Sequence, residues 1–172
     1  MQQKFELRFN KKDISFWASR YDYKGDNIIC NVLAPKIQKQ KYLTKDDFML
    51  LCRWKSPRPT KQYEKNDDYF IKEVTSIALS TTDPKLSIEI LTLLNGVSWP
   101  VASVMLHFGK INEYPIIDYR ALWSLNIDKP SFYNFELWND YSNYCKRLSA
   151  ECNVSMRDLD RALWQYSKEK QK

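Results

Sequence analysis

Two motifs in the second half of the chain carry the residue types best suited to chemistry. The first is Leu94-Asn95-Gly96-Val97-Ser98, a glycine turn between apolar segments, and the second is Tyr114-Pro115-Ile116-Ile117-Asp118, which ends in a carboxylate. A turn that opens a helix can direct backbone N–H groups and the helix dipole at a phosphate. A carboxylate held at a helix start can stabilise positive charge and activate water. Each motif also has an ordinary interpretation, as a connection between helices and as a helix cap.

The segments before the turn predict two helices separated by a polar loop. Thr44 is followed three residues later by Asp47, which is the pattern of a capping box, and the prolines of Ser56-Pro57-Arg58-Pro59 end the helix that follows. Residues 56–68 form a basic loop, and Phe70 lies in the next helix. The sequence offers three caps for that helix: Asn66, Asp67 and Asp68.

The glycine turn itself is predicted to join two helices. Asp83-Pro84 begins the first of them, whose buried stripe we expect to be Leu86, Ile90, Leu91 and Leu94. Ser98 caps the second helix, and Pro100 is tolerated in its first turn because that position has no intrahelical N–H partner. The second helix is apolar on nearly every side, which predicts a position in the centre of the protein.

The remaining segments complete a mainly α-helical prediction. A short helix begins at Asp13, and two helices close the chain, one from Ser131 and one capped by Ser155 and Asp158. Asn27–Leu33 reads as a strand or a buried loop. We therefore predict a single helical domain over 1–172, with a core at 44–125, a hairpin at 94–99, C-terminal helices at 131–170 and a short strand element near the N-terminus as one alternative.

Positive charge is concentrated in the first half of the chain. Residues 1–82 hold 16 Lys and Arg against 10 Asp and Glu, whereas residues 83–172 hold 11 of each. Such a distribution provides an electrostatic footprint for phosphate, but its ordinary interpretation is a solvated lysine-rich surface, and charge alone does not indicate a nucleic-acid partner.

Composition argues against metal and membrane functions. The cysteines Cys30, Cys52, Cys145 and Cys152 lack zinc or iron–sulfur spacing, and the single histidine, His107, lies in an apolar helix. We expect these residues in the core, with no metal held by side chains and no cofactor. No apolar run reaches membrane-spanning length, so we expect a cytoplasmic protein, nucleoid-associated in a bacterium, with no membrane partner.

Residues 86–125 resemble the core motif of the helix-hairpin-helix DNA glycosylase superfamily, as found in the mismatch adenine and 8-oxoguanine glycosylases. The hairpin at Leu94–Ser98 and the acid step ending at Asp118 carry the resemblance. It implies a base-excision repair enzyme that hydrolyses the N-glycosidic bond of a damaged or mispaired base. Asp118 would stabilise the oxocarbenium-like transition state and activate water. Pro100 replaces the lysine of bifunctional members, so the resemblance implies a monofunctional glycosylase without lyase activity.

The resemblance also implies which residues contact the ligand. Double-stranded DNA is the expected partner of a monomeric protein, and Tyr119 and Arg120 are candidates for the base pocket, although Arg120 has an alternative role as an ion-pair partner of Asp118. Carbonyls of Leu94 and Val97 are candidates for holding a monovalent cation. The expected DNA contacts are Gly96, Val97, Ser98, Trp99, Arg58, Lys61 and Lys65.

A second interpretation stays open beside the catalytic one. Ser98 stands where the family has a second hairpin glycine, and Pro100 removes one N–H from the helix start. In this alternative the chain is a non-catalytic helix-hairpin-helix module that binds DNA or another protein, and Asp118 is only a cap.

Overall fold

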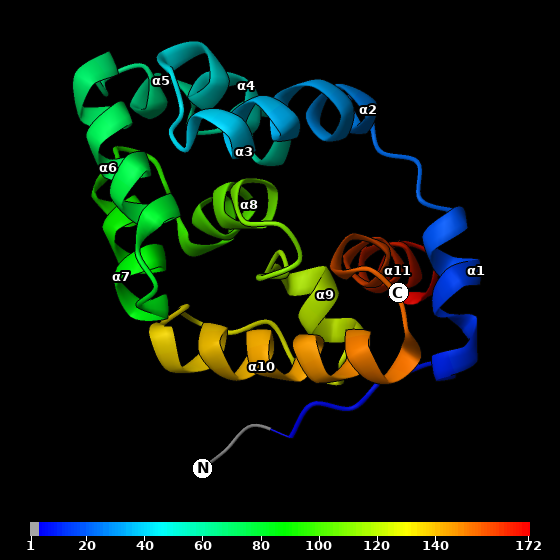
Figure 1. The fold of residues 1–172 in the computed structure, drawn as a ribbon. Helices are drawn as coiled ribbons and strands as arrows, with labels where there is room; N and C mark the ends of the chain where they lie inside the picture. The colour runs from blue at the N-terminus through cyan, green and yellow to red at the C-terminus, as the bar shows by residue number, and fades with distance from the viewer. Residues whose placement is uncertain (1–3) are drawn as a thin grey trace. The chain divides into compact units, whose positions relative to one another are not determined.

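The computed structural model describes residues 4–172, and within them the chain is helical, without β-strands. The predicted mainly α class is therefore confirmed. Two compact units are formed (Figure 1). The first unit combines the two ends of the chain, up to Asp22 and from Asn112 onward, and the second comprises Tyr23–Ile111.

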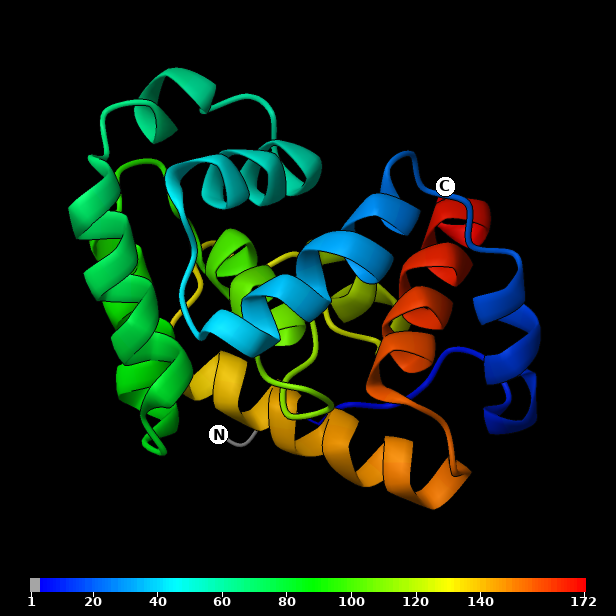
Figure 2. The ribbon, with the colours of Figure 1, turned by 45° about the horizontal axis from the view of Figure 1, so that its top comes forward.

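The second unit consists of short helices around one buried helix. Its elements are α2 (Asp26–Ile28), the π-helical η2 (Ile29–Leu33), α3 (Ala34–Gln40), α4 (Lys45–Lys55), α5 (Thr60–Tyr63), α6 (Asp68–Ser80), α7 (Pro84–Glu89), the 3-10 helix η3 (Ile90–Leu93) and α8 (Trp99–Gly109). In α8 every residue from Val101 to Gly109 is buried, as its apolar sequence predicts. Helices α3, α4, α6 and α7 all pack against it, and α6 and α7 run side by side (Figure 2).

Caps begin the helices of the second unit largely where the sequence predicts them. Thr44 and Asp47 form a complete capping box at α4, and Asp83 accepts a hydrogen bond from the Leu86 N–H at α7. Of the three cap candidates for α6, Asp67 is the one used. Each of these signals depends on residues within one helical turn, which is why it can be read from the chain.

Two predictions for the second unit are wrong. Asn27–Leu33 is neither strand nor loop, because α2, η2 and α3 form a continuous helical segment whose inner face buries Ile29 and Leu33. Leu86 is 45% exposed, and Ser87 and Ile88 are buried instead. The predicted stripe assumed one α-helix over 84–94, whereas α7 tightens into the 3-10 helix η3 and the inward face changes.

The first unit is built around its C-terminal helix. Its elements are the 3-10 helix η1 (Lys11–Asp13), α1 (Ile14–Ser19), α9 (Tyr119–Ser124), α10 (Phe135–Cys152) and α11 (Met156–Lys170). Helix α11 packs against α1, α9 and α10. The extended N-terminal segment is not a strand, but it pairs with the end of α9, where the Glu6 N–H donates to the Leu125 carbonyl (3.0 Å) and the Arg8 N–H to the Ser124 carbonyl (3.0 Å).

Two of the four N-caps that the sequence predicts for helices of the first unit are confirmed. Asp118 caps α9 and Ser155 caps α11 through a bond to the Asp158 N–H. Helix α10 begins at Phe135 rather than Ser131, because Asn134 supplies the capping oxygen to the Leu137 N–H. Asp13 occupies the N-cap position of α1 without a side-chain cap bond, since a 3-10 turn precedes it.

Cys52, Cys145 and His107 are buried, whereas Cys30 and Cys152 are partly exposed, and none of these four cysteines, which all lie within residues 4–172, forms a disulfide. Among residues 4–172, no three His, Cys, Asp or Glu side chains converge as metal ligands. Within the same residues, no helix combines the length and apolar character needed to cross a lipid bilayer.

Candidate nucleic-acid interface

The predicted hairpin is a tight turn between η3 and α8. The Val97 N–H donates to the Leu94 carbonyl (3.0 Å), and Gly96 has a φ of +82°, a conformation that favours glycine. Leu94 and Val97 are buried and anchor the turn, whereas Asn95 and Ser98 are exposed. The turn therefore presents its tip to solvent on an apolar base.

Asn66 connects this turn to the basic loop. The Asn95 N–H donates to Asn66 Oδ1 (2.7 Å), and the Asn66 side-chain amide donates to the carbonyls of Asn95 (3.1 Å) and Tyr63 (3.0 Å). Asn66 is buried and Asn95 is exposed, so the bonds between them are partly shielded from water. One side chain thus joins two segments that are 29 residues apart in the sequence.

Tyr63 lies directly under the glycine of the turn. A Cβ atom on Gly96 would lie 2.8 Å from Tyr63 Cδ1 and 3.0 Å from Gln62 Cβ. The Tyr63 hydroxyl donates to the Ser56 carbonyl (3.1 Å), and burial raises the pKa of Tyr63 to about 12, with a contribution from Cys52. Gly96 is therefore required by its φ and by the close ring, independently of any ligand.

The cations predicted to bind DNA lie in the loop that this network holds. Arg58, Lys61 and Lys65 are exposed, and Lys61 and Lys65 are each followed in the chain by a residue that contacts the hairpin, Gln62 and Asn66. The Lys45 ammonium donates to the carbonyls of Glu64 (2.8 Å) and Asn66, which fixes the end of the loop. We name five exposed polar residues of turn and loop the hairpin surface: Asn95, Ser98, Arg58, Lys61 and Lys65. The same loop also exposes the carboxylates Glu64, Asp67 and Asp68, which balance its three cations.

Helix α8 begins at the hairpin surface, directly after Ser98. Ser98 occupies the N-cap position but makes no side-chain cap bond, and Pro100 lies in the first turn. The first-turn N–H groups are therefore not satisfied by the Ser98 hydroxyl, although Pro100 reduces their number. Val97 is buried and Trp99 is half-buried, so of the predicted hairpin contacts Ser98 is the most accessible.

Asp118 caps α9 in the first unit, while the hairpin belongs to the second. Its Oδ1 accepts a hydrogen bond from the Ala121 N–H (2.9 Å), and the residue is 9% exposed. Burial, together with the charge of Asp118, raises the pKa of Tyr133 to about 12. Tyr133 is a neighbour of the carboxylate that the sequence did not reveal, because it lies in an irregular segment without a periodic pattern.

The two predicted pocket residues have different environments. Tyr119 is 41% exposed, and the Arg120 guanidinium lies over the rings of Tyr119 (5.2 Å) and Trp164 (5.5 Å). The aromatic partner of Arg120 on α11 was missed, because a contact between two distant helices leaves no local signal.

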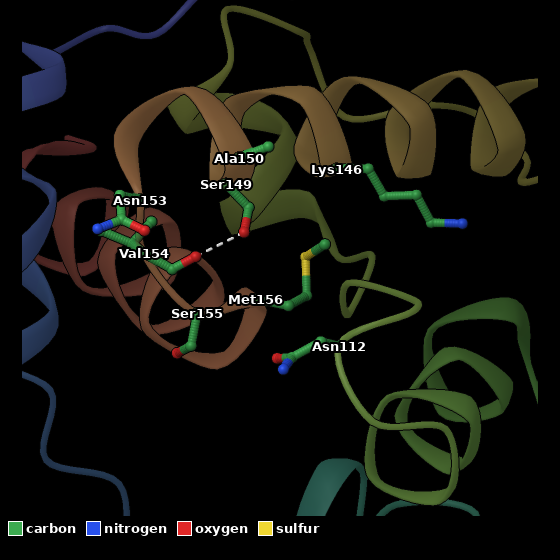
Figure 3. Close-up of a pocket in the computed structure, with 8 residues that line it drawn as sticks. All are labelled: Asn112, Lys146, Ser149, Ala150, Asn153, Val154, Ser155 and Met156. Atoms are coloured by element: carbon green, nitrogen blue, oxygen red, sulfur yellow. Dashed lines mark hydrogen bonds between the residues drawn. The ribbon is translucent and has the colours of Figure 1, made fainter.

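A pocket of about 470 Å³ opens in the first unit where α10 ends and α11 begins (Figure 3). The Ser149 hydroxyl donates to the Val154 carbonyl (2.6 Å) and braces the connection between the helices. Tyr119 and Arg120 are not among the residues that line it, which are Asn112, Lys146, Ser149, Ala150, Asn153, Val154, Ser155 and Met156.

Comparison of the chain with protein-family models, with curated proteins and with solved structures finds no match in any of the three.

Proposed function

We propose that the chain binds duplex DNA through the hairpin surface and excises an altered base as a monofunctional glycosylase, with Asp118 as its essential carboxylate. The observation that carries this proposal is the bond network of Asn66, which unites the hairpin and the basic loop. From the sequence, the hairpin and the loop were two separate candidates for DNA contact. Because Asn66 bonds them together, they support a single interface.

The hairpin surface has the chemistry of a sequence-independent phosphate contact. Arg58, Lys61 and Lys65 supply exposed positive charge, and the start of α8 adds N–H donors and the positive end of a helix dipole. Such contacts fix the register of a protein on DNA without reading bases. Because the bonds of Asn66 hold turn and loop together, little ordering is needed when the phosphates arrive.

Asp118 fits the proposed chemistry in its local environment. The bond from the Ala121 N–H fixes the side chain, and burial reduces screening of its charge. In the proposed reaction the C1′–N bond breaks and its electrons leave with the base. Water adds hydroxide to C1′ while Asp118 stabilises the positive sugar and accepts or relays the proton.

The second candidate function is non-catalytic DNA binding, and one observation favours it. The capping bond to Ala121 and the burial of Asp118 account for this residue as a structural cap. In that case the hairpin surface is the whole functional site.

A base-release assay on duplexes that carry different altered bases separates the two candidates. For a glycosylase, the protein creates alkali-labile abasic sites, and Asp118→Asn lowers the rate by about 10²–10³-fold. For a binder, neither protein releases a base, yet duplex affinity falls steeply with salt. The variant K61Q/K65Q is then expected to reduce the slope of log affinity against log salt by about 2, since each phosphate contact contributes about 0.9. Absence of duplex binding at low salt contradicts both candidates.

A further inference from the structure

One face of α11 carries three cationic side chains and one aromatic ring. Arg157, Arg161, Trp164 and Lys168 follow one another at intervals of four, three and four residues, which places them on one side of a helix. Leu159 and Leu163 are buried on the other side. This pattern is additional to the apolar stripe that α11 needs for packing.

Rings and cations from three segments of the first unit meet on this face. The Lys168 ammonium lies 5.2 Å from the Trp164 ring centre, and the Arg120 guanidinium lies over both Trp164 (5.5 Å) and Tyr119 (5.2 Å). Tyr21 and Trp164 pack in a T-shaped arrangement, with ring centres 5.3 Å apart. We name the ordered series Tyr119, Arg120, Trp164 and Lys168 the aromatic–cation strip.

The carboxylates of α11 are engaged by other cations. Asp160 pairs with Arg157 (2.5 Å), and Asp158 lies 3.6 Å from Arg161. Glu169 pairs with Arg20 (2.9 Å), and hydrogen bonds from Arg20 and Gln165 lower its pKa. The three carboxylates of α11 are therefore partnered by cations outside the strip, and Arg120 and Lys168 are the positive charges within it.

We propose that the aromatic–cation strip binds single-stranded DNA, with an unpaired base stacked on Tyr119 and phosphates beside Arg120 and Lys168. Rings interleaved with cations suit this ligand because unpaired bases expose their faces and remain joined to phosphates. A duplex keeps its bases stacked inside, so it offers the strip phosphates only. The proposal does not rest on the hairpin surface, whose residues lie in the other unit, although the strip includes Tyr119 and Arg120, the two residues that the resemblance implies for the base pocket.

Fluorescence anisotropy with a short oligothymidylate at low salt tests the proposal on the full chain. Tyr119 is 41% exposed and Lys168 is exposed, so the variant Y119S/K168Q is expected to fold, and circular dichroism melting checks this. We expect its dissociation constant to rise by about tenfold or more, because one stacking contact and one phosphate contact are lost. An abasic strand of equal charge is expected to bind the wild-type protein about tenfold more weakly than oligothymidylate.

A matched variant sharpens the result. F132S/K129Q removes an exposed aromatic ring and an exposed lysine from elsewhere in the same unit, and it is expected to retain wild-type affinity for oligothymidylate. Wild-type affinity in Y119S/K168Q, an equal loss in F132S/K129Q, equal binding of the abasic strand, or no single-strand binding by the wild type would overturn the proposal. Loss of duplex binding in K61Q/K65Q bears only on the proposed duplex contact.

Discussion

Asn66 and Asn95 form a reciprocal pair in which each residue donates to the other. The Asn95 N–H bonds to Asn66 Oδ1 at 2.7 Å, and the Asn66 side-chain amide bonds to the Asn95 carbonyl at 3.1 Å. The pair fixes the tip of the hairpin by its backbone. The orientation of the candidate phosphate-binding turn therefore depends on a residue in the basic loop.

Replacing Asn66 with alanine should destabilise the second unit and loosen the hairpin. The substitution removes the side-chain partner of the Asn95 N–H and of the Asn95 carbonyl, while the Tyr63 carbonyl keeps its bond from the Asn66 N–H (3.2 Å). Loss of hydrogen-bond partners in such a partly buried network costs about 1–3 kcal/mol. Urea denaturation measures the free energy of unfolding, and duplex affinity is measured on the folded protein. Asn143→Ala, which changes an exposed asparagine of α10, is the control. Equal stability of the two variants would contradict a clamping role for Asn66.

Gly96→Ala and Gly25→Ala separate backbone strain from crowding. Both glycines have positive φ, +82° and +85°, so both substitutions should destabilise the protein by about 1 kcal/mol through strain. Only Gly96 also lies against a ring, because its Cβ would be 2.8 Å from Tyr63 Cδ1, compared with 3.4 Å from Trp54 Cδ1 for Gly25. We expect Gly96→Ala to be less stable than Gly25→Ala by a further 1–3 kcal/mol or so. Equal thermal denaturation midpoints would show that the Tyr63 contact relaxes without penalty.

The parts of the fold that could be predicted are those specified within one helical turn. The Thr44–Asp47 capping box, the Asp83 cap and the Asp118 cap are all confirmed, because a cap depends only on the next three residues. The burial of α8 could also be predicted, because a helix that is apolar on nearly every side has no polar face to expose to water. Leu86 was placed wrongly because the change from α7 to the 3-10 helix η3 alters the period on which a stripe is counted.

Only part of the candidate site could be predicted from the sequence. Gly96 and the loop cations stand out by residue type, but nothing local indicates that Asn66 and Tyr63 join them. Asn66 was considered only as a helix cap, and Asp67 fills that role instead. Hydrogen bonds across 29 residues depend on how helices pack, and one sequence does not encode that packing in any short pattern.

The hydrogen-bonded carboxylate of Asp47 should make the protein less stable in acid. Burial by itself raises the pKa of Asp47, but hydrogen bonds from Lys36, Thr44 and Gln40 outweigh it, so the pKa lies below its ordinary value of 3.8. A lowered folded-state pKa means that the stabilisation is complete above the unfolded-state pKa and is lost as the pH falls through the folded-state pKa. We expect Asp47→Asn to unfold more easily at neutral pH by about 1.5–3 kcal/mol, the range for charge-assisted bonds.

Urea denaturation across the acid range checks this expectation. The difference between wild type and Asp47→Asn should shrink as the pH falls below about 4, because the wild-type carboxylate becomes neutral too. Asp46→Asn alters the neighbouring exposed carboxylate and serves as the control. A constant difference between wild type and Asp47→Asn at every pH would mean that ionisation of Asp47 does not contribute.

Two substitutions of Asp118 separate its structural role from its proposed chemical one. Asparagine caps a helix about as well as aspartate, whereas alanine cannot accept the hydrogen bond from the Ala121 N–H. Asp118→Asn should therefore keep wild-type stability within a few tenths of a kcal/mol, and Asp118→Ala should lose about 1 kcal/mol.

Asp83→Asn and Asp83→Ala at the exposed cap of α7 provide the same pair of changes away from Asp118. If Asp118 is catalytic, both of its variants lose base release equally despite their different stabilities, because both lack the negative charge. Base release that followed stability instead, with Asp118→Asn as active as the wild type, would show that the residue acts only by capping α9.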